Sequence, residues 1–209
     1  AGFAHLISGP LFNLAVSDID QLRVEQAGER LRHLLELDPS DPFAKGELAR
    51  LALAVGEEVG FRRRLEDFSR TVANGDARFD EGLSLLRGAA ALLDGDPRRA
   101  DVLLRSAGQE GEAWLALSVA AAGGRPPAAP RDGWGVAQAA ALLISCSDSG
   151  PAAAEAFEVD AATPAGALAF VLAERVAGRR LPLDPEHRRR AARTLRTAGL
   201  VGWADSCDG

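Results

Sequence analysis

The sequence predicts an all-α protein built from antiparallel helix pairs, and three observations support this. The 209 residues include 41 Ala and 29 Leu against 12 Val, 3 Ile and 4 Thr. Ala and Leu favour helices, whereas β-branched residues favour strands, so the composition excludes a β-sandwich or barrel. Capping residues and prolines recur at regular intervals, and apolar residues between them follow helical spacing. Aromatic residues make up only 5% and Tyr and Met are absent, so small residues must provide close helix packing.

Helix starts and stops are marked by paired signals. Asp41-Pro42, Asp96-Pro97, Thr163-Pro164 and Asp184-Pro185 each join an N-capping side chain to a proline at the first helical position. Glycines fall where helices are expected to stop. They are Gly56, Gly75, Gly95, Gly108, Gly123, Gly178 and Gly199.

These signals predict about ten helices in order. The first is expected to divide near Ser17 to Gln21, and Gly9-Pro10 is expected to interrupt the apolar segment before it, which is too short for a membrane span. In the range 42–55, Leu48, Leu51 and Val55 form an apolar stripe after the Asp41 cap. Short loops make successive helices antiparallel neighbours. The predicted ranges are 11–37, 42–55, 58–73, 78–94, 97–107, 111–123, 133–146, 151–158, 164–178 and 185–198.

The chain has one break in composition, the Pro- and Gly-rich stretch around residues 125–132. It is either a long turn within one array or a linker between two helical parts. The first part would be 1–124. The second, 133–209, is richer in Ala and ends in a basic helix that would cap the array.

Residues 8–124 resemble tetratricopeptide repeats (TPR). The segment 27–39 is similar to the second helix and Leu-Asp-Pro exit of such a repeat. The unit at 81–110 carries Gly88, Gly95-Asp96, Ala100, Leu104 and Ala107 at the family's spacing, and Trp114-Leu115-Ala116 looks like the next start. Phe61 departs from the pattern, which has a small residue there. The resemblance implies a right-handed solenoid of stacked helix pairs with a groove for a partner. An irregular Ala- and Leu-rich helical bundle is the alternative.

The resemblance also implies which residues face the groove. The positions carried over are Phe12, Val16, Phe43, Gly46, Arg50, Leu53, Leu85, Ala89, Leu92, Leu115 and Val119. Arg50 is the one obvious charge among them, and the cationic and amide set of a carboxylate clamp is missing. We therefore expect a protein or peptide partner that offers an apolar or amphipathic segment, unless the chain's own terminal helix fills the groove. The substitutions Leu85→Asp and Leu115→Asp are expected to abolish partner binding without unfolding the chain.

No residue pattern indicates catalysis. The three histidines, His5, His33 and His187, lack the spacing of a helical metal site, and neither Cys146 nor Cys207 has a partner at metal-ligand spacing. Gly-rich segments lack the residues of a phosphate loop. We expect a non-enzymatic protein without a metal or cofactor. An all-helical enzyme that uses ungrouped acidic residues is a further alternative.

Net charge and arginine clusters suggest a second class of function. The formal charge of -6 argues against a surface that addresses nucleic acid or a membrane as a whole. The helix 185–198 is nevertheless basic, and Arg189, Arg193 and Arg196 are candidate anion contacts, so a nucleic-acid-associated regulator is the alternative function. Arg62-Arg63-Arg64 is expected to splay into solvent or to pair with neighbouring acids such as Glu58 and Glu66.

The cysteine count, the N-terminal sequence and the ratio of Arg to Lys bear on where the protein is found. Two cysteines are too few for a disulfide framework, although one bridge between Cys146 and Cys207 would fit an exported protein. No signal peptide is visible, and a start at Ala1 is expected of a processed chain or of part of a longer one. With 23 Arg and one Lys, the sequence is typical of a GC-rich, bacterial-type genome. We expect a cytoplasmic adaptor or the interaction domain of a larger regulatory protein, with export as the alternative.

Overall fold

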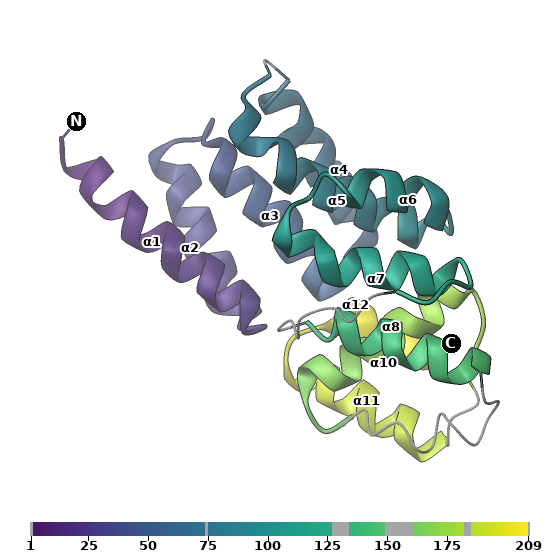
Figure 1. Ribbon diagram of the computed structural model, residues 1–209. Coiled ribbons are helices and arrows are strands. Elements are labelled where there is room, and N and C mark those ends of the chain that lie inside the picture. Colours follow the sequence, from purple (N-terminus) through teal and green to yellow (C-terminus); the bar gives the residue numbers. More distant parts are fainter. Residues whose placement is uncertain (1, 74, 127–133, 149–160, 182–184, 209) are drawn as a thin grey trace.

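The computed structural model describes residues 2–73, 75–126, 134–148, 161–181 and 185–208, and these ranges contain helices and no strand (Figure 1). The predicted all-α fold class is confirmed. The α-helices are α1 (Gly2–Asp20), α2 (Val24–Leu37), α3 (Pro42–Val55), α4 (Glu58–Thr71), α5 (Asp80–Leu93), α6 (Pro97–Leu104), α7 (Glu112–Ala121), α8 (Val136–Asp148), α10 (Pro164–Ala177), α11 (Pro185–Thr197) and α12 (Val201–Asp208). Short 3₁₀ turns, η1 (Ala77–Phe79) and η2 (Gln109–Gly111), precede α5 and α7.

Successive helices pack in pairs, and the pairs stack. α1 packs on α2, α3 on α4, α5 on α6 and α7 on α8. The first helices α1, α3, α5 and α7 also contact one another in that order, as Figure 1 shows, and form what we call the first-helix face. One continuous hydrophobic core runs through the stack, and alanines such as Ala44, Ala49, Ala89 and Ala100 are fully buried in it. Small side chains at these positions let the helices approach closely.

The capping signals position the helices as predicted. The Asp41 carboxylate accepts hydrogen bonds from the backbone N–H groups of Phe43 and Ala44, and α3 starts at the following proline. Asp96 and Thr163 cap α6 and α10 in the same way. Gly56 ends α3 in the left-handed conformation at φ 75°. The fourth predicted cap, Asp184, lies outside the described residues.

The two ends of the chain differ most from the predicted helix ranges. Helix α1 runs from Gly2 through Gly9-Pro10, because the exposed Pro10 removes only one backbone hydrogen bond from a helix held by residues on both sides. Helix α1 ends at Asp20, and α2 begins at Val24 after Leu22 adopts a positive φ, so the predicted division near Ser17 to Gln21 is confirmed. A helix over Val201–Asp208, α12, was not expected after the glycine stop at Gly199. The predicted helix 151–158 and most of the predicted linker 125–132 lie outside the described residues.

The last four helices fold back onto the array. α8, α10, α11 and α12 pack together as a C-terminal block beneath α7, with α10 at its centre (Figure 1). Two helices of the block touch the first-helix face, since α10 contacts α5 and α12 contacts α3. The basic helix α11 docks through Ala191, Ala192 and Leu195, which are all buried. Within the described part of the chain, no helix combines the length and apolarity required to cross a bilayer.

Candidate functional site

An aromatic pocket lies on the first-helix face between α1, α3 and α5. Phe12 comes from α1, Phe43 from the first turn of α3, and Phe79 from η1. The ring centroid of Phe43 is 5.8 Å from that of Phe12 and 4.8 Å from that of Phe79, which in turn lies 6.1 Å from Phe68 of α4. We call this site, with a volume of about 140 Å³, the phenylalanine pocket.

Phe43 is the exposed member of this aromatic cluster. Its side chain is 44% exposed, whereas Phe68 and Phe79 are 3% and 7% exposed and form a rigid floor. The Asp41 cap fixes the first turn of α3 and so fixes where Phe43 stands. Gly46, one turn later, leaves room for Phe68, because a Cβ there would lie 3.2 Å from that ring. A large apolar side chain is thus held in solvent by its local structure.

The rim of the pocket carries charges that are neutralised in pairs. The Arg78 guanidinium lies 6.0 Å from the Phe43 ring centroid and 5.7 Å from that of Phe79. It also donates to both carboxylate oxygens of Asp76 at 3.0 Å, and this hydrogen bonding lowers the pKa of Asp76 and raises the pKa of Arg78. Arg50 pairs with Asp20 and, at 3.4 Å, with Glu47. The pocket is therefore an apolar site whose rim carries basic and acidic side chains already joined in ion pairs.

The structure separates the predicted groove residues into three groups. Phe12, Phe43, Arg50 and Leu85 line the phenylalanine pocket, together with the predicted Gly46. Val16, Leu115 and Val119 are half-buried and lie outside it. Leu53 and Leu92 are only 3% and 1% exposed, so they are core positions rather than groove positions, as is the fully buried Ala89. Leu85 is 6% exposed, so Asp there would bury a charge and unfold the chain, contrary to the expectation from sequence.

Beside the pocket, the first-helix face is covered by Trp134 from the segment before α8. Its indole N–H donates to the carbonyl oxygen of Ile19 at 3.2 Å, and its ring packs 6.4 Å from that of Trp114. The Arg50 guanidinium lies 5.5 Å from the Trp134 ring centroid. Arg50, predicted to be the charge of an open groove, therefore joins α1, α3 and this tryptophan instead. The groove is closed at this point by the chain itself.

A second tryptophan, Trp203 of α12, closes the face at the end of α3. Its indole N–H lies 3.1 Å from the carbonyl oxygens of both Leu53 and Ala54, which are among the last carbonyls of α3. A Cβ on Gly56 would lie 2.6 Å from the backbone nitrogen of Trp203, and a Cβ on Gly202 would lie 2.3 Å from the carbonyl oxygen of Gly56. Two glycines thus allow α12 and α3 to touch backbone to backbone. The sequence left open that the chain's terminal helix fills the groove. The terminal helix is α12, which contacts α3, whereas the basic helix α11 packs mainly on α12 and α10.

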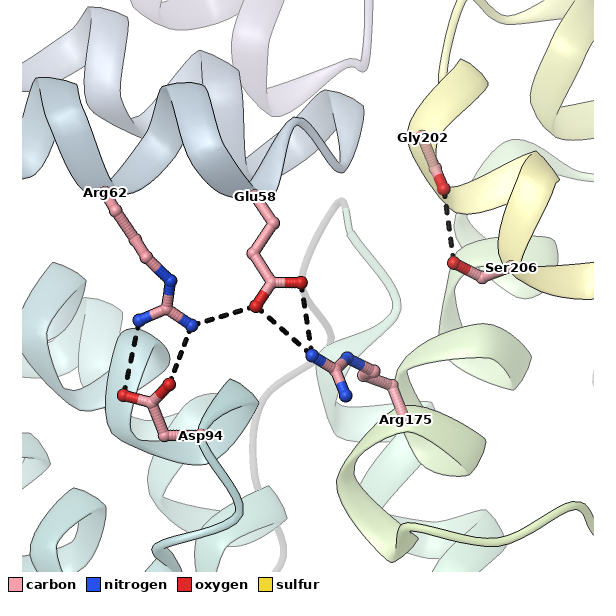
Figure 2. Close-up of polar contacts among 6 residues, drawn as sticks. All are labelled: Glu58, Arg62, Asp94, Arg175, Gly202 and Ser206. Carbon is pink, nitrogen blue, oxygen red and sulfur yellow. Dashed lines mark hydrogen bonds and ion pairs between the residues drawn. The ribbon is translucent and has the colours of Figure 1, made fainter.

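An ion-pair network joins the repeats to the C-terminal block next to this contact (Figure 2). Arg62 lies 2.9 Å from Glu58 and 2.7 Å from Asp94, and Arg175 of α10 lies 3.1 Å from Glu58. The hydrogen bond from Arg62 lowers the pKa of Glu58, with Arg175 adding to the effect and burial opposing it. Hydrogen bonds to Asp94 and then to Glu58 raise the pKa of Arg62. Four side chains from three separate segments are thus held together.

We expect Glu58→Gln to lower stability in a pH-dependent way. Because the folded-state pKa of Glu58 lies below its ordinary 4.5, its contribution is complete above pH 4.5 and is lost as pH falls through the lowered value. The side chain is 43% exposed, so we expect a loss below about 1 kcal/mol. Urea unfolding of both proteins between pH 3 and pH 7 measures it. A difference that is largest at the acid end would contradict the prediction.

The residue types that bind metal ions are scattered over the described part of the chain. Within that part of the chain, no three His, Cys, Asp or Glu side chains are placed to hold a metal ion. Cys207 is buried, and its thiol lies 3.8 Å from the carbonyl oxygen of Trp203. The side chain of Cys146, the other half of the bridge considered from sequence, lies outside the described part of the structure. Arg196, predicted as an anion contact, lies 3.5 Å from Asp205, whereas Arg189 and Arg193 are exposed on α11.

No protein-family model, curated protein or solved structure matches this chain.

The sequence indicated Phe12, Phe43 and Arg50 but missed several residues around them. Phe68, Arg78 and Phe79 complete the pocket. The available signal was a Phe near the start of the units at 42–75 and 81–110. Trp134 and Trp203 were missed as covers of the first-helix face. The available signal was their residue type, because a Trp next to a glycine in a turn is a candidate for insertion into a neighbouring element.

Proposed function

We propose that the protein is a non-enzymatic interaction scaffold or adaptor, or the interaction domain of a larger regulatory protein. It binds an apolar or amphipathic segment of a partner protein at the phenylalanine pocket. The observation that carries this proposal is the 44% exposed Phe43, held by a capped helix start over a buried aromatic floor. Large aromatic side chains in preformed pockets are the groups that dominate binding energy at protein interfaces.

The size and charge of the pocket define the occupant. An apolar cavity of about 150 Å³ is large enough to take up benzene, and the phenylalanine pocket has a similar volume of about 140 Å³. It therefore suits one large apolar side chain, such as Leu or Phe, on the apolar face of the partner segment. Arg78 and Arg50 are already paired with acids, so a strongly acidic tail would gain little there.

We expect Phe43→Asp to abolish capture of the partner while the protein stays folded. An anchor of this kind contributes about 2 kcal/mol or more, or about 30-fold in Kd. The protein is used as bait in a lysate treated with nuclease, at low and high salt, and retained proteins are identified by mass spectrometry. Val59→Asp is the matched control, because Val59 is 83% exposed on α4 and does not line the pocket. Equal capture by all three proteins would refute the assignment.

A second candidate function uses the exposed face of α11. Arg189, Arg190 and Arg193 are exposed and form no ion pair within the described residues, so this face could contact phosphates. Binding of that kind weakens steeply with salt, whereas an apolar contact persists. The same capture experiment separates them. Recovery of nucleic acid that is lost at high salt, and unchanged by Phe43→Asp, would favour this second function.

A further inference from the structure

A second cleft lies behind α3, away from the phenylalanine pocket. It lies between the second helices α2 and α4, and we call it the second-helix cleft. Each residue of an α-helix advances by about 100°, so Lys45 points about 200° away from Phe43 on α3. Two sides of one helix therefore serve two separate surfaces. The cleft has a volume of about 530 Å³ and is lined by Leu35, Pro39, Lys45, Leu48, Arg63, Arg64, Asp67 and Arg70.

The cleft carries an excess of positive charge that the chain does not neutralise. Lys45 is used internally, since its ammonium lies 3.3 Å from Asp67 and 3.1 Å from the Thr71 hydroxyl. Arg70 lies 3.9 Å from Glu66. Arg63 and Arg64 form no ion pair with any of the described residues. Two guanidinium groups thus face the cleft with free donors.

The three consecutive arginines of α4 have different surroundings. Only Arg62 follows the expectation of pairing with a neighbouring acid, because it reaches Glu58 and Asp94. Arg63 and Arg64 lie about 100° and 200° further around the helix, beyond the reach of those two acids. The triplet is therefore divided between an internal bridge and an open basic surface.

The chemistry of the cleft selects its ligand. Guanidinium groups bind carboxylates through paired hydrogen bonds, and a weakly hydrated cation is well suited to an interface. The floor is aliphatic, with half-buried Leu35 and Leu48 and exposed Pro39. No aromatic ring is among the described lining residues, so the cleft lacks the stacking platform on which single-stranded nucleic acid binds.

We propose that the second-helix cleft binds an acidic segment of a partner protein. Aspartate or glutamate side chains of the segment pair with Arg63 and Arg64, and an aliphatic side chain between them packs on Leu35 and Leu48. Charge complementarity carries the proposal, because two guanidinium groups without an ion pair among the described residues border an apolar floor. This site is independent of the phenylalanine pocket.

A random library of 12-residue peptides displayed on phage tests the proposal. The folded protein, its Arg63→Glu/Arg64→Glu variant and an Arg98→Glu/Arg99→Glu control select binders in parallel. Arg98 and Arg99 are also adjacent and exposed, and they lie outside the cleft, so the control has the same charge change. We expect the wild type and the control to enrich peptides rich in Asp, Glu and aliphatic residues. The cleft variant should bind those peptides at least tenfold more weakly.

Two further probes decide between ligand classes. A 20-nucleotide single strand and phosphatidylglycerol vesicles are titrated into the same three proteins. Acidic peptides that the Arg63→Glu/Arg64→Glu variant retains would overturn the proposal, and so would a wild type that enriches no acidic peptide. If the cleft variant instead loses binding to the oligonucleotide or to the vesicles, with no change in peptide binding, the partner class is wrong. Phe43→Asp should leave acidic-peptide binding unchanged, which separates this site from the pocket.

Discussion

Trp203→Ala is expected to lower the free energy of unfolding by about 3–5 kcal/mol, the usual cost of truncating a buried Trp or Phe. The side chain is 5% exposed and fills the space between α12 and the end of α3. Its indole N–H also donates to Leu53 and Ala54, so its loss leaves a cavity and weakens the end of α3. We expect the C-terminal block to detach from the repeats before the repeats unfold.

Urea unfolding followed by circular dichroism measures this loss. Trp203→Phe is the control, because it keeps most of the apolar volume and removes only the indole donor. We expect it to lower the free energy of unfolding by about 1 kcal/mol. The alanine variant keeps Trp114 and Trp134, whose rings pack 6.4 Å apart. Their combined fluorescence should shift to longer wavelength if the block detaches and exposes Trp134. An alanine variant within 1 kcal/mol of the wild type would show that α12 does not hold the block in place.

Gly56→Ala is expected to be far more harmful than Gly95→Ala, although the two glycines share one backbone conformation. Their φ angles are 75° and 77°, and an L side chain in this region costs about 1–2 kcal/mol. A Cβ on Gly95 would have no atom within 4 Å. A Cβ on Gly56 would lie 2.6 Å from the backbone nitrogen of Trp203 and 2.9 Å from the carbonyl carbon of Gly202. Crowding of backbone against backbone adds about 1–3 kcal/mol at Gly56.

The difference between these two variants isolates the contact of α12 with α3. Thermal unfolding under identical conditions measures both, and the shared conformational cost cancels in the comparison. In a chain that ends at Gly199, Gly56→Ala should destabilise by about as much as Gly95→Ala does in the same shortened chain, because the clash with α12 has gone. Equal destabilisation of Gly56→Ala and Gly95→Ala in the full chain would mean that the two helices do not pack as closely as described.

Local signals predicted the repeats well because they act over a few residues. The Asp41, Asp96 and Thr163 caps all accept the expected backbone hydrogen bonds. Apolar spacing predicted a buried stripe on the helix 42–55, where Leu51 is buried and Leu48 and Val55 are half-buried. Pro10 misled the prediction, since a proline on an exposed side of a long helix lowers helix propensity without ending the helix.

The closure of the first-helix face could not be predicted in the same way. Trp134 bonds to a carbonyl 115 residues earlier, and Trp203 bonds to one 150 residues earlier. No short-range pattern encodes such contacts, because they depend on how the C-terminal block returns to the array. The groove positions carried over from the family resemblance failed at Leu53 and Leu92 for a related reason. Repeats that pack tightly bury positions that a more open solenoid would expose.

Amide hydrogen exchange with and without the captured partner tests the central claim most directly. If the phenylalanine pocket is the binding site, the partner should slow exchange in peptides that cover residues 42–50 and 77–86, around Phe43 and Phe79. Exchange in α11 should stay the same. Unchanged exchange at the pocket, with protection confined to α11, would contradict the account and assign partner binding to the arginine face.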